Sequence, residues 1–206
     1  MTITKLLLLI MSTTFFVSFA GAADTPQWTA VAAAYSSAQT KGDSGAIEDA
    51  LDLATKYVEQ HPGDGRAMTY RGSLAAMKAR ESYLPWRKLG SLNQGVDWMD
   101  EGVGAIVASK ASAGTGLEIE VRMVRGITSA RIPKMFGRGS VARADFLAVI
   151  ANPHFSAVNP NHKASAYAWL AVLSNRQNDD AGTKEWLSKA RAADTAVANA
   201  IWEQYK

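Results

Sequence analysis

The chain of 206 residues carries 22 Lys and Arg against 19 Asp and Glu, and its formal net charge of +3 is too small for the strongly basic surface of a nucleic-acid-binding protein. It contains no cysteine, which excludes disulfide bonds and a lipid anchor attached to a cysteine. The length is enough for one domain with a substantial core, which packing alone must hold together.

The N-terminus has the three parts of a cleavable secretory signal. Lys5 supplies a positive charge, an apolar stretch follows from Leu6 to Val17, and Ala20-Gly21-Ala22 has the small-residue pattern of a cleavage site. Three polar residues interrupt the apolar stretch, which favours cleavage over a membrane anchor. We therefore expect a signal peptide at 1–22 and a soluble, periplasmic or secreted domain at 23–206.

Beyond this leader, apolar residues recur three and four positions apart, as on one face of an α-helix. In chain order the stripes are Trp28–Tyr35, Ile47–Val58, Ala67–Met77, Leu89–Ile106, Leu117–Thr128, Phe146–Ile150, Tyr167–Ala171 and Val197–Tyr205. Thr25-Pro26 is a typical helix start, and glycine-rich or proline-containing segments separate the stripes. No segment alternates in the manner of a strand, so the sequence predicts an all-α fold.

One helix-pair pattern occurs near both ends of the chain. Near the C-terminus, Ala164–Gln177 and Ala181–Arg191 form a pair, and near the front a similar pair closes with His61-Pro62. Recurring small helical hairpins are usual in scaffolds that bind other proteins.

Three sets of residues resemble the tetratricopeptide-repeat (TPR) family over about half of the chain. The sets are Tyr70-Arg71-Gly72 for a first helix, Ala50, Ala54, Tyr57 and Pro62 for a second helix, and Trp169-Leu170-Ala171 with Leu187 and Ala190 for a further repeat. The segment 81–159 departs from the repeat length. The resemblance implies a TPR-like, right-handed α-α superhelix of helical hairpins with an irregular middle section.

The same resemblance implies that first helices line a concave groove for a peptide or helix of another protein. Its lining would be Arg66, Thr69, Ser73 and Met77 in the front half, and Ser165, Val172, Asn175 and Arg176 in the back half. The small residues Gly72 and Ala171 would let neighbouring helices approach closely.

A basic stretch is the second candidate for a binding surface. It contains Arg122, Arg125, Arg131, Lys134, Arg138 and Arg143, with no Asp or Glu between Glu120 and Asp145. Pro133 and two glycines place Met135-Phe136 on a bend within it. Two interpretations are open: a solvated face in which Glu118 pairs with Arg122 along a helix, or a contact surface for an acidic partner or an anionic membrane leaflet.

Patterns for catalysis are weak. Glu81-Ser82 is similar to the catalytic pair of helical lytic transglycosylases, in which a carboxylic acid protonates a glycosidic oxygen, but the other motifs of that family are missing. The three histidines, His61, His154 and His162, have no metal-site spacing on a helix.

We therefore expect no enzyme activity, no cofactor and no metal. The predicted function is an exported protein-binding or assembly module, with an accessory role in an envelope transport or assembly system as one form of it. The alternative is a helical cell-wall-directed enzyme or glycan-binding protein with Glu81 as its acid.

Overall fold

The computed structural model describes residues 25–81 and 85–206, with side chains for residues 25–79 and 89–206. The elements are α1 (Pro26–Lys41), α2 (Ser44–Gln60), α3 (Gly65–Glu81), α4 (Pro85–Ala108), α5 (Gly116–Arg131), η1 (Lys134–Phe136), α6 (Gly139–Ala151), η2 (Pro153–Ala157), α7 (Pro160–Asn175), α8 (Asp180–Ala193) and α9 (Thr195–Tyr205). All of these described elements are helical, which confirms the predicted all-α class.

Local sequence signals explain where the helices begin and end. Thr25 Oγ1 accepts a hydrogen bond from the backbone N–H of Trp28 (3.1 Å), which caps α1 as its Thr-Pro start predicts. Asp43 caps α2 in the same way by accepting from Ala46 N–H at 2.8 Å. α1 ends at Lys41, and the residue that caps it, Gly42, has a φ of +64° that is readily available only to a residue without a Cβ.

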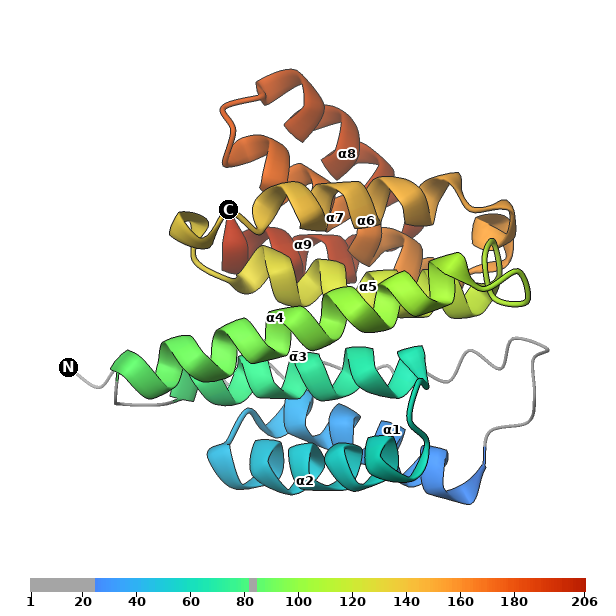
Figure 1. The fold of residues 1–206 in the computed structure, drawn as a ribbon. Coiled ribbons are helices and arrows are strands. Elements are labelled where there is room, and N and C mark those ends of the chain that lie inside the picture. Colours follow the sequence, from blue (N-terminus) through green and yellow to red (C-terminus); the bar gives the residue numbers. More distant parts are fainter. Residues whose placement is uncertain (1–24, 82–84) are drawn as a thin grey trace.

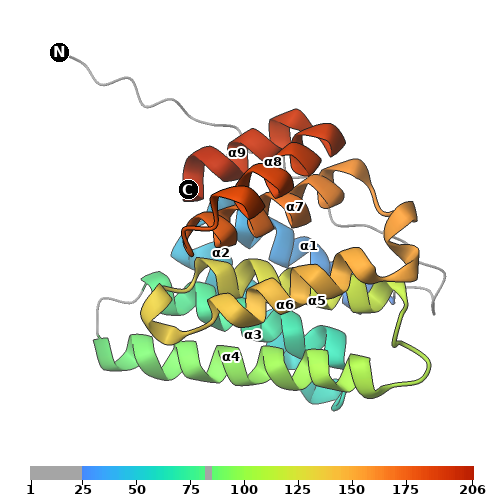
Figure 2. The ribbon, with the colours of Figure 1, turned by 90° about the horizontal axis from the view of Figure 1, so that it is seen from above.

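The helices form successive hairpins, with α1 and α2 at one end of the molecule and α8 at the other, while α9 folds back beside α7 (Figures 1 and 2). Consecutive helices pack against each other along the whole chain. In addition, α3 contacts α5, α5 contacts α7, and α7 contacts α9. The odd-numbered helices from α3 to α9 therefore make a continuous inner row, and α4, α6 and α8 lie beside it.

The closest packing joins α3 to α4 and depends on four glycines. A Cβ on Gly72 would lie 2.5 Å from the carbonyl oxygen of Gly95, and one on Gly102 would lie 2.5 Å from that of Gly65. Both distances are far below van der Waals contact, so the two backbones touch at points one heptad apart along each helix. The close approach predicted at Gly72 is confirmed.

Two apolar clusters fill the main interior. The first joins α1, α2 and α3 around Trp28, Tyr57 and Tyr70, and the second joins α5 through α9 around Phe146 and Trp169. Trp28 packs edge-on against both tyrosines, with ring centroids 5.6 Å and 5.1 Å away.

A chain of buried polar groups connects the first cluster to α5. The Tyr35 hydroxyl lies 2.9 Å from Ser73 Oγ, which lies 2.8 Å from Thr128 Oγ1, and Thr128 donates to the carbonyl of Val124. Because each of these three hydroxyls has a hydrogen-bond partner, burying them costs little desolvation free energy.

The predicted groove is wrong for Thr69, Ser73 and Val172, whose exposed fractions are all 0%. Thr69 faces Gly102 of α4 and donates to the carbonyl of Gly65, and Ser73 joins the hydroxyl chain described above. Neighbouring helices therefore cover the middle of the α3 face, at Thr69 and Ser73, that the repeat pattern assigned to an open groove.

The glycine contact predicts opposite effects for two Gly→Ala substitutions in the same helix pair. Gly72→Ala should lower the free energy of unfolding by about 1–3 kcal/mol, because the new methyl forces α3 and α4 apart. Gly104→Ala, on an open face of α4 with no atom within 4 Å of the new Cβ, should raise it by about 0.5–1 kcal/mol through helix propensity. Urea unfolding measures both changes in the free energy of unfolding. The same change in the two variants would contradict a close backbone contact at Gly72.

Candidate functional site

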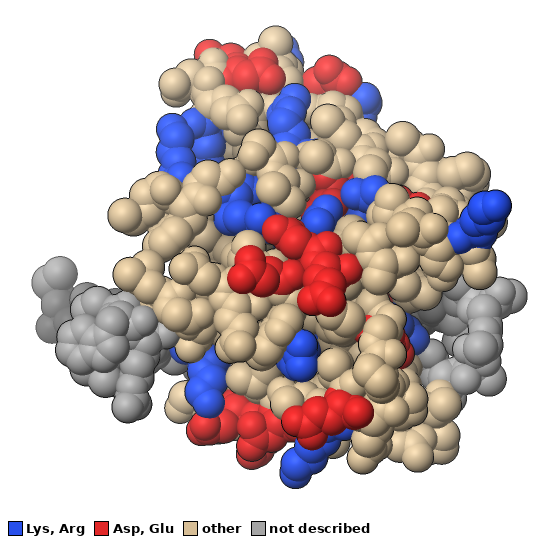
Figure 3. Space-filling view, in the orientation of Figure 1, with Lys and Arg blue, Asp and Glu red and all other residues tan. Residues whose placement is uncertain are grey.

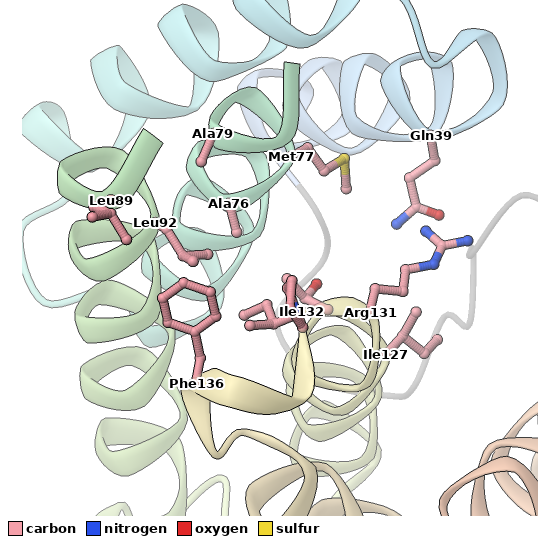
Figure 4. Close-up of a pocket in the computed structure, with 12 residues that line it drawn as sticks. Gln39, Ala76, Met77, Ala79, Leu89, Leu92, Ile127, Arg131, Ile132 and Phe136 are labelled. Carbon is pink, nitrogen blue, oxygen red and sulfur yellow. The ribbon is translucent and has the colours of Figure 1, made fainter. Parts of the chain in front are cut away.

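A pocket opens where one end of α1 and α3 meets the start of α4 and the end of α5 (Figure 4). Its volume is about 210 Å³. We call it the end pocket. Its walls from α3 and α4 are Ala76, Met77, Ala79, Leu89 and Leu92. The opposite walls are Gln39 of α1, then Ile127, Thr128, Arg131, Ile132, Pro133 and Phe136.

The sequence after α5 explains how this pocket closes. Ile132 has extended backbone (φ −71°, ψ 137°) directly before Pro133, which ends α5 as the proline predicts. The short helix η1 follows and stops at Gly137, whose φ is +69°. This turn brings Phe136 back against Ala76, Ala79 and Leu92, so the bend predicted around Met135-Phe136 forms one wall.

The pocket is apolar except at one side. Figure 4 shows the Arg131 guanidinium and the Gln39 amide facing each other there, away from Leu89, Leu92 and Phe136. The guanidinium carbon of Arg131 also lies 5.3 Å from the ring centroid of Tyr205 in α9. Among the described side chains, neither Arg131 nor Lys134 takes part in an ion pair. Within the described part of the chain, a cation without a carboxylate partner therefore borders an apolar cavity.

Apolar side chains are also exposed beside the pocket. Met135, next to Phe136 on η1, is 86% exposed, and Leu89 on the α4 wall is 46% exposed. Lys134 on the same turn is exposed as well. We call Lys134-Met135 the basic turn.

Arg143 of the basic stretch donates to Ser174 Oγ at 3.1 Å, and the other three arginines are held by an ionic cluster between α4, α5 and α6. Arg125 binds Asp145 through two nitrogens, at 2.8 Å and 2.7 Å, and Arg122 reaches the same carboxylate at 3.0 Å. The Asp145 side chain is fully buried. Arg138 binds both oxygens of Asp100, at 2.8 Å and 2.7 Å. Acidic and basic side chains lie together on the face shown in Figure 3.

This cluster corrects one part of the sequence interpretation. The structure shows no open contact surface at Arg122, Arg125 and Arg138. Asp100 and Asp145 lie outside the stretch that lacks acidic residues, but in the folded protein they form ion pairs with these three arginines. The pairing predicted between Glu118 and Arg122 is confirmed, at 2.6 Å.

The pKa values of two carboxyls reflect these partners. Burial works to raise the pKa of Asp100, but hydrogen bonds and charge from Arg138 and Arg125 outweigh it and hold that pKa below its ordinary value. Burial likewise opposes ionisation of Glu118, yet the Gly114 amide and Arg122 lower its pKa.

The structure brings three of the predicted binding residues together, since Met77, Arg131 and Phe136 all line the end pocket. Lys134 lies on the adjoining basic turn. Arg66 lies elsewhere, with its Nε 2.8 Å from Glu120 Oε1. Arg176 donates to the carbonyl of Ala130 at 2.6 Å and so holds α7 to α5.

Sequence reasoning missed Gln39, Leu92, Ile127 and Ile132 in the pocket. Each reads as an ordinary helical or flanking residue in the sequence, so only folding reveals that they converge. The side chain of Glu81 lies outside the described residues. Within the described part of the chain, no group of three His, Asp or Glu side chains is arranged to hold a metal ion.

No family model, no curated protein and no solved structure matches this chain. Among the described helices, none combines the length and the apolar character needed to cross a membrane.

Breaking the buried ion pair should be costly. Asp145→Asn keeps the shape of the side chain but leaves Arg122 and Arg125 without their buried counter-charge, so the free energy of unfolding should fall by about 3–5 kcal/mol. The matched control is Glu185→Gln, which removes an exposed pair with Lys189 and should change stability by less than about 0.5 kcal/mol. Similar losses in both variants would show that burial of the pair is unimportant.

The lowered carboxyl pKa values predict a loss of stability in acid. A carboxyl with a lower pKa in the folded state than in the unfolded state stabilises the fold fully above about pH 5, and this contribution declines as the pH falls below about 4. Urea unfolding from pH 6 to pH 3 should show this decline. The double variant Asp100→Asn, Glu118→Gln should be less stable than wild type at pH 6 and should lose less stability between pH 6 and pH 3. A loss as large as that of wild type would show that these two carboxyls do not cause the decline.

Proposed function

We propose that this protein is an exported binding module of TPR-like helical hairpins that serves in the assembly or accessory machinery of the cell envelope. Export is supported by the leader pattern at residues 1–22. The TPR-like architecture is supported by the succession of antiparallel hairpins and by the contacts among α3, α5, α7 and α9. In such arrays the first helices of successive hairpins form one row, as these odd-numbered helices do.

The observation that carries the binding role is the exposure of Met135. A methionine side chain that is 86% exposed adds no burial free energy to the fold. On a rigidly held turn, however, it provides an adaptable apolar contact for a partner. The turn is fixed on both sides. Phe136 packs against α3 and α4, and Arg138 is bound through two nitrogens to Asp100.

The chemistry of the basic turn selects the partner. Lys134 and Arg131 make no ion pair among the described side chains, and Leu89 adds a further exposed apolar group beside the pocket. The partner that complements this surface is a protein segment with apolar side chains flanked by Asp or Glu. Binding would thus occur at the basic turn, since Thr69 and Ser73, in the middle of the α3 face assigned to a groove, are buried.

The test is affinity capture from an envelope extract with the chain 23–206 as bait. Wild type and Leu147→Gln should retain the same acidic partner, because Leu147 is also exposed, at 37%, but belongs to α6. Met135→Gln and Lys134→Gln should lose it. Association measured with the captured partner should slow as salt rises, because exposed charges are screened beyond about 10 Å at 0.1 M salt. Equal capture by all four proteins would overturn the proposal.

A further inference from the structure

We propose that the end pocket is a binding site for a short- to medium-chain alkyl monocarboxylate, with its chain in the cavity and its carboxylate on Arg131 and Gln39. The proposal concerns the interior of the pocket. It does not rest on the proposed function, which concerns the exposed turn beside it.

The size of the cavity limits the ligand. An apolar cavity of about 150 Å³ holds benzene, while drug-sized ligands occupy pockets of about 300–1,000 Å³. At about 210 Å³, the end pocket accommodates a short alkyl chain and excludes a nucleotide or a complete lipid. The walls are mainly aliphatic, from Ala76, Ala79, Leu89, Leu92 and Ile127, and this favours a flexible alkyl chain over a polar group.

The charge on one side of the cavity selects the head group. The guanidinium of Arg131 has a planar set of N–H donors that matches the two oxygens of a carboxylate. It lies close enough to the buried Tyr35 hydroxyl for its charge to act against the rise in the Tyr35 pKa that burial causes. Arg131 is exposed and therefore places a positive charge at the rim of an apolar space. An anion with an apolar chain would contact the cavity with its chain and Arg131 with its charge.

The second polar group, Gln39, is exposed on α1, one helical turn after the buried Tyr35. The Tyr35 hydroxyl belongs to the chain of polar groups through Ser73 to Thr128. Thr128 itself lines the pocket. An amide NH₂ has two donor hydrogens, and Gln39 faces Arg131, so it can donate to a carboxylate held by Arg131. The polar side of the pocket is thus held in place by α1, α3 and α5 together.

Calorimetric titration of the chain 23–206 with butyrate, hexanoate, octanoate and 1-octanol tests the site. Each added CH₂ should tighten binding by about fourfold, which is the transfer free energy of a buried methylene, until the cavity is full. Octanoate should bind at least about tenfold more tightly than 1-octanol, because only the carboxylate receives charge-assisted hydrogen bonds. Octanoate that does not bind, or that binds no better than 1-octanol, would overturn the proposal.

Variants assign the binding to the pocket. Arg131→Gln should abolish the preference for octanoate over 1-octanol, while Lys134→Gln, which removes an equal charge outside the lining, should change octanoate affinity by less than about twofold. Leu89→Gln should weaken both ligands, because it places a polar group in the apolar wall. An unchanged preference in Arg131→Gln would place the carboxylate elsewhere and refute the site.

Met135→Gln separates this proposal from the proposed function. Met135 lies outside the pocket lining, so the variant should bind octanoate as wild type does even though it loses the protein partner. Loss of octanoate binding in Met135→Gln would show that the ligand binds on the exposed turn, against the site inferred here. Thermal unfolding of each variant confirms that it is folded before titration.

Discussion

The backbone contact between α3 and α4 is the constraint on which the rest of the structure depends. With glycine at all four contact points, the two helices approach until a carbonyl of one meets the Cα of the other. This contact sets the position of α4, and α4 carries Asp100. Asp100 binds Arg138 directly after η1. The contact thereby fixes the turn that places Phe136 against α3 and α4, and so determines the shape of the end pocket.

The ionic cluster shows how a basic segment can fold without making a basic surface. Burying Asp145 alone would be very unfavourable, because a carboxylate loses its hydration in the interior. Arg125 and Arg122 compensate with charge and with hydrogen bonds to both oxygens, which joins α6 to α5. The geometry of this pairing holds the helices in register. Arg131 and Lys134 remain outside it, and Arg131 gives the end pocket its positive side.

The two proposals use different parts of one end of the molecule. The basic turn presents an exposed methionine on a fixed support, and a protein partner with apolar and acidic side chains complements it. The end pocket lies behind that turn and combines an aliphatic cavity with a cation at its edge. Phe136 belongs to the pocket wall and follows Met135 directly in η1, so occupancy of the pocket and presentation of the turn share a structural element.

The sequence by itself determined the all-α class, most helix positions, the start of α1, the close approach at Gly72 and the pairing of Glu118 with Arg122. Apart from the close approach, which a glycine permits but which the packing of α3 on α4 completes, these features depend on periodicity, capping and spacing within one helix, which local residues fix. The sequence also singled out Met77, Arg131 and Phe136. Only the tertiary structure placed them in one cavity with Gln39, paired Arg138 with Asp100, and buried Thr69 and Ser73. Contacts between residues distant in the chain are decided by how whole helices pack, and no local pattern encodes that arrangement.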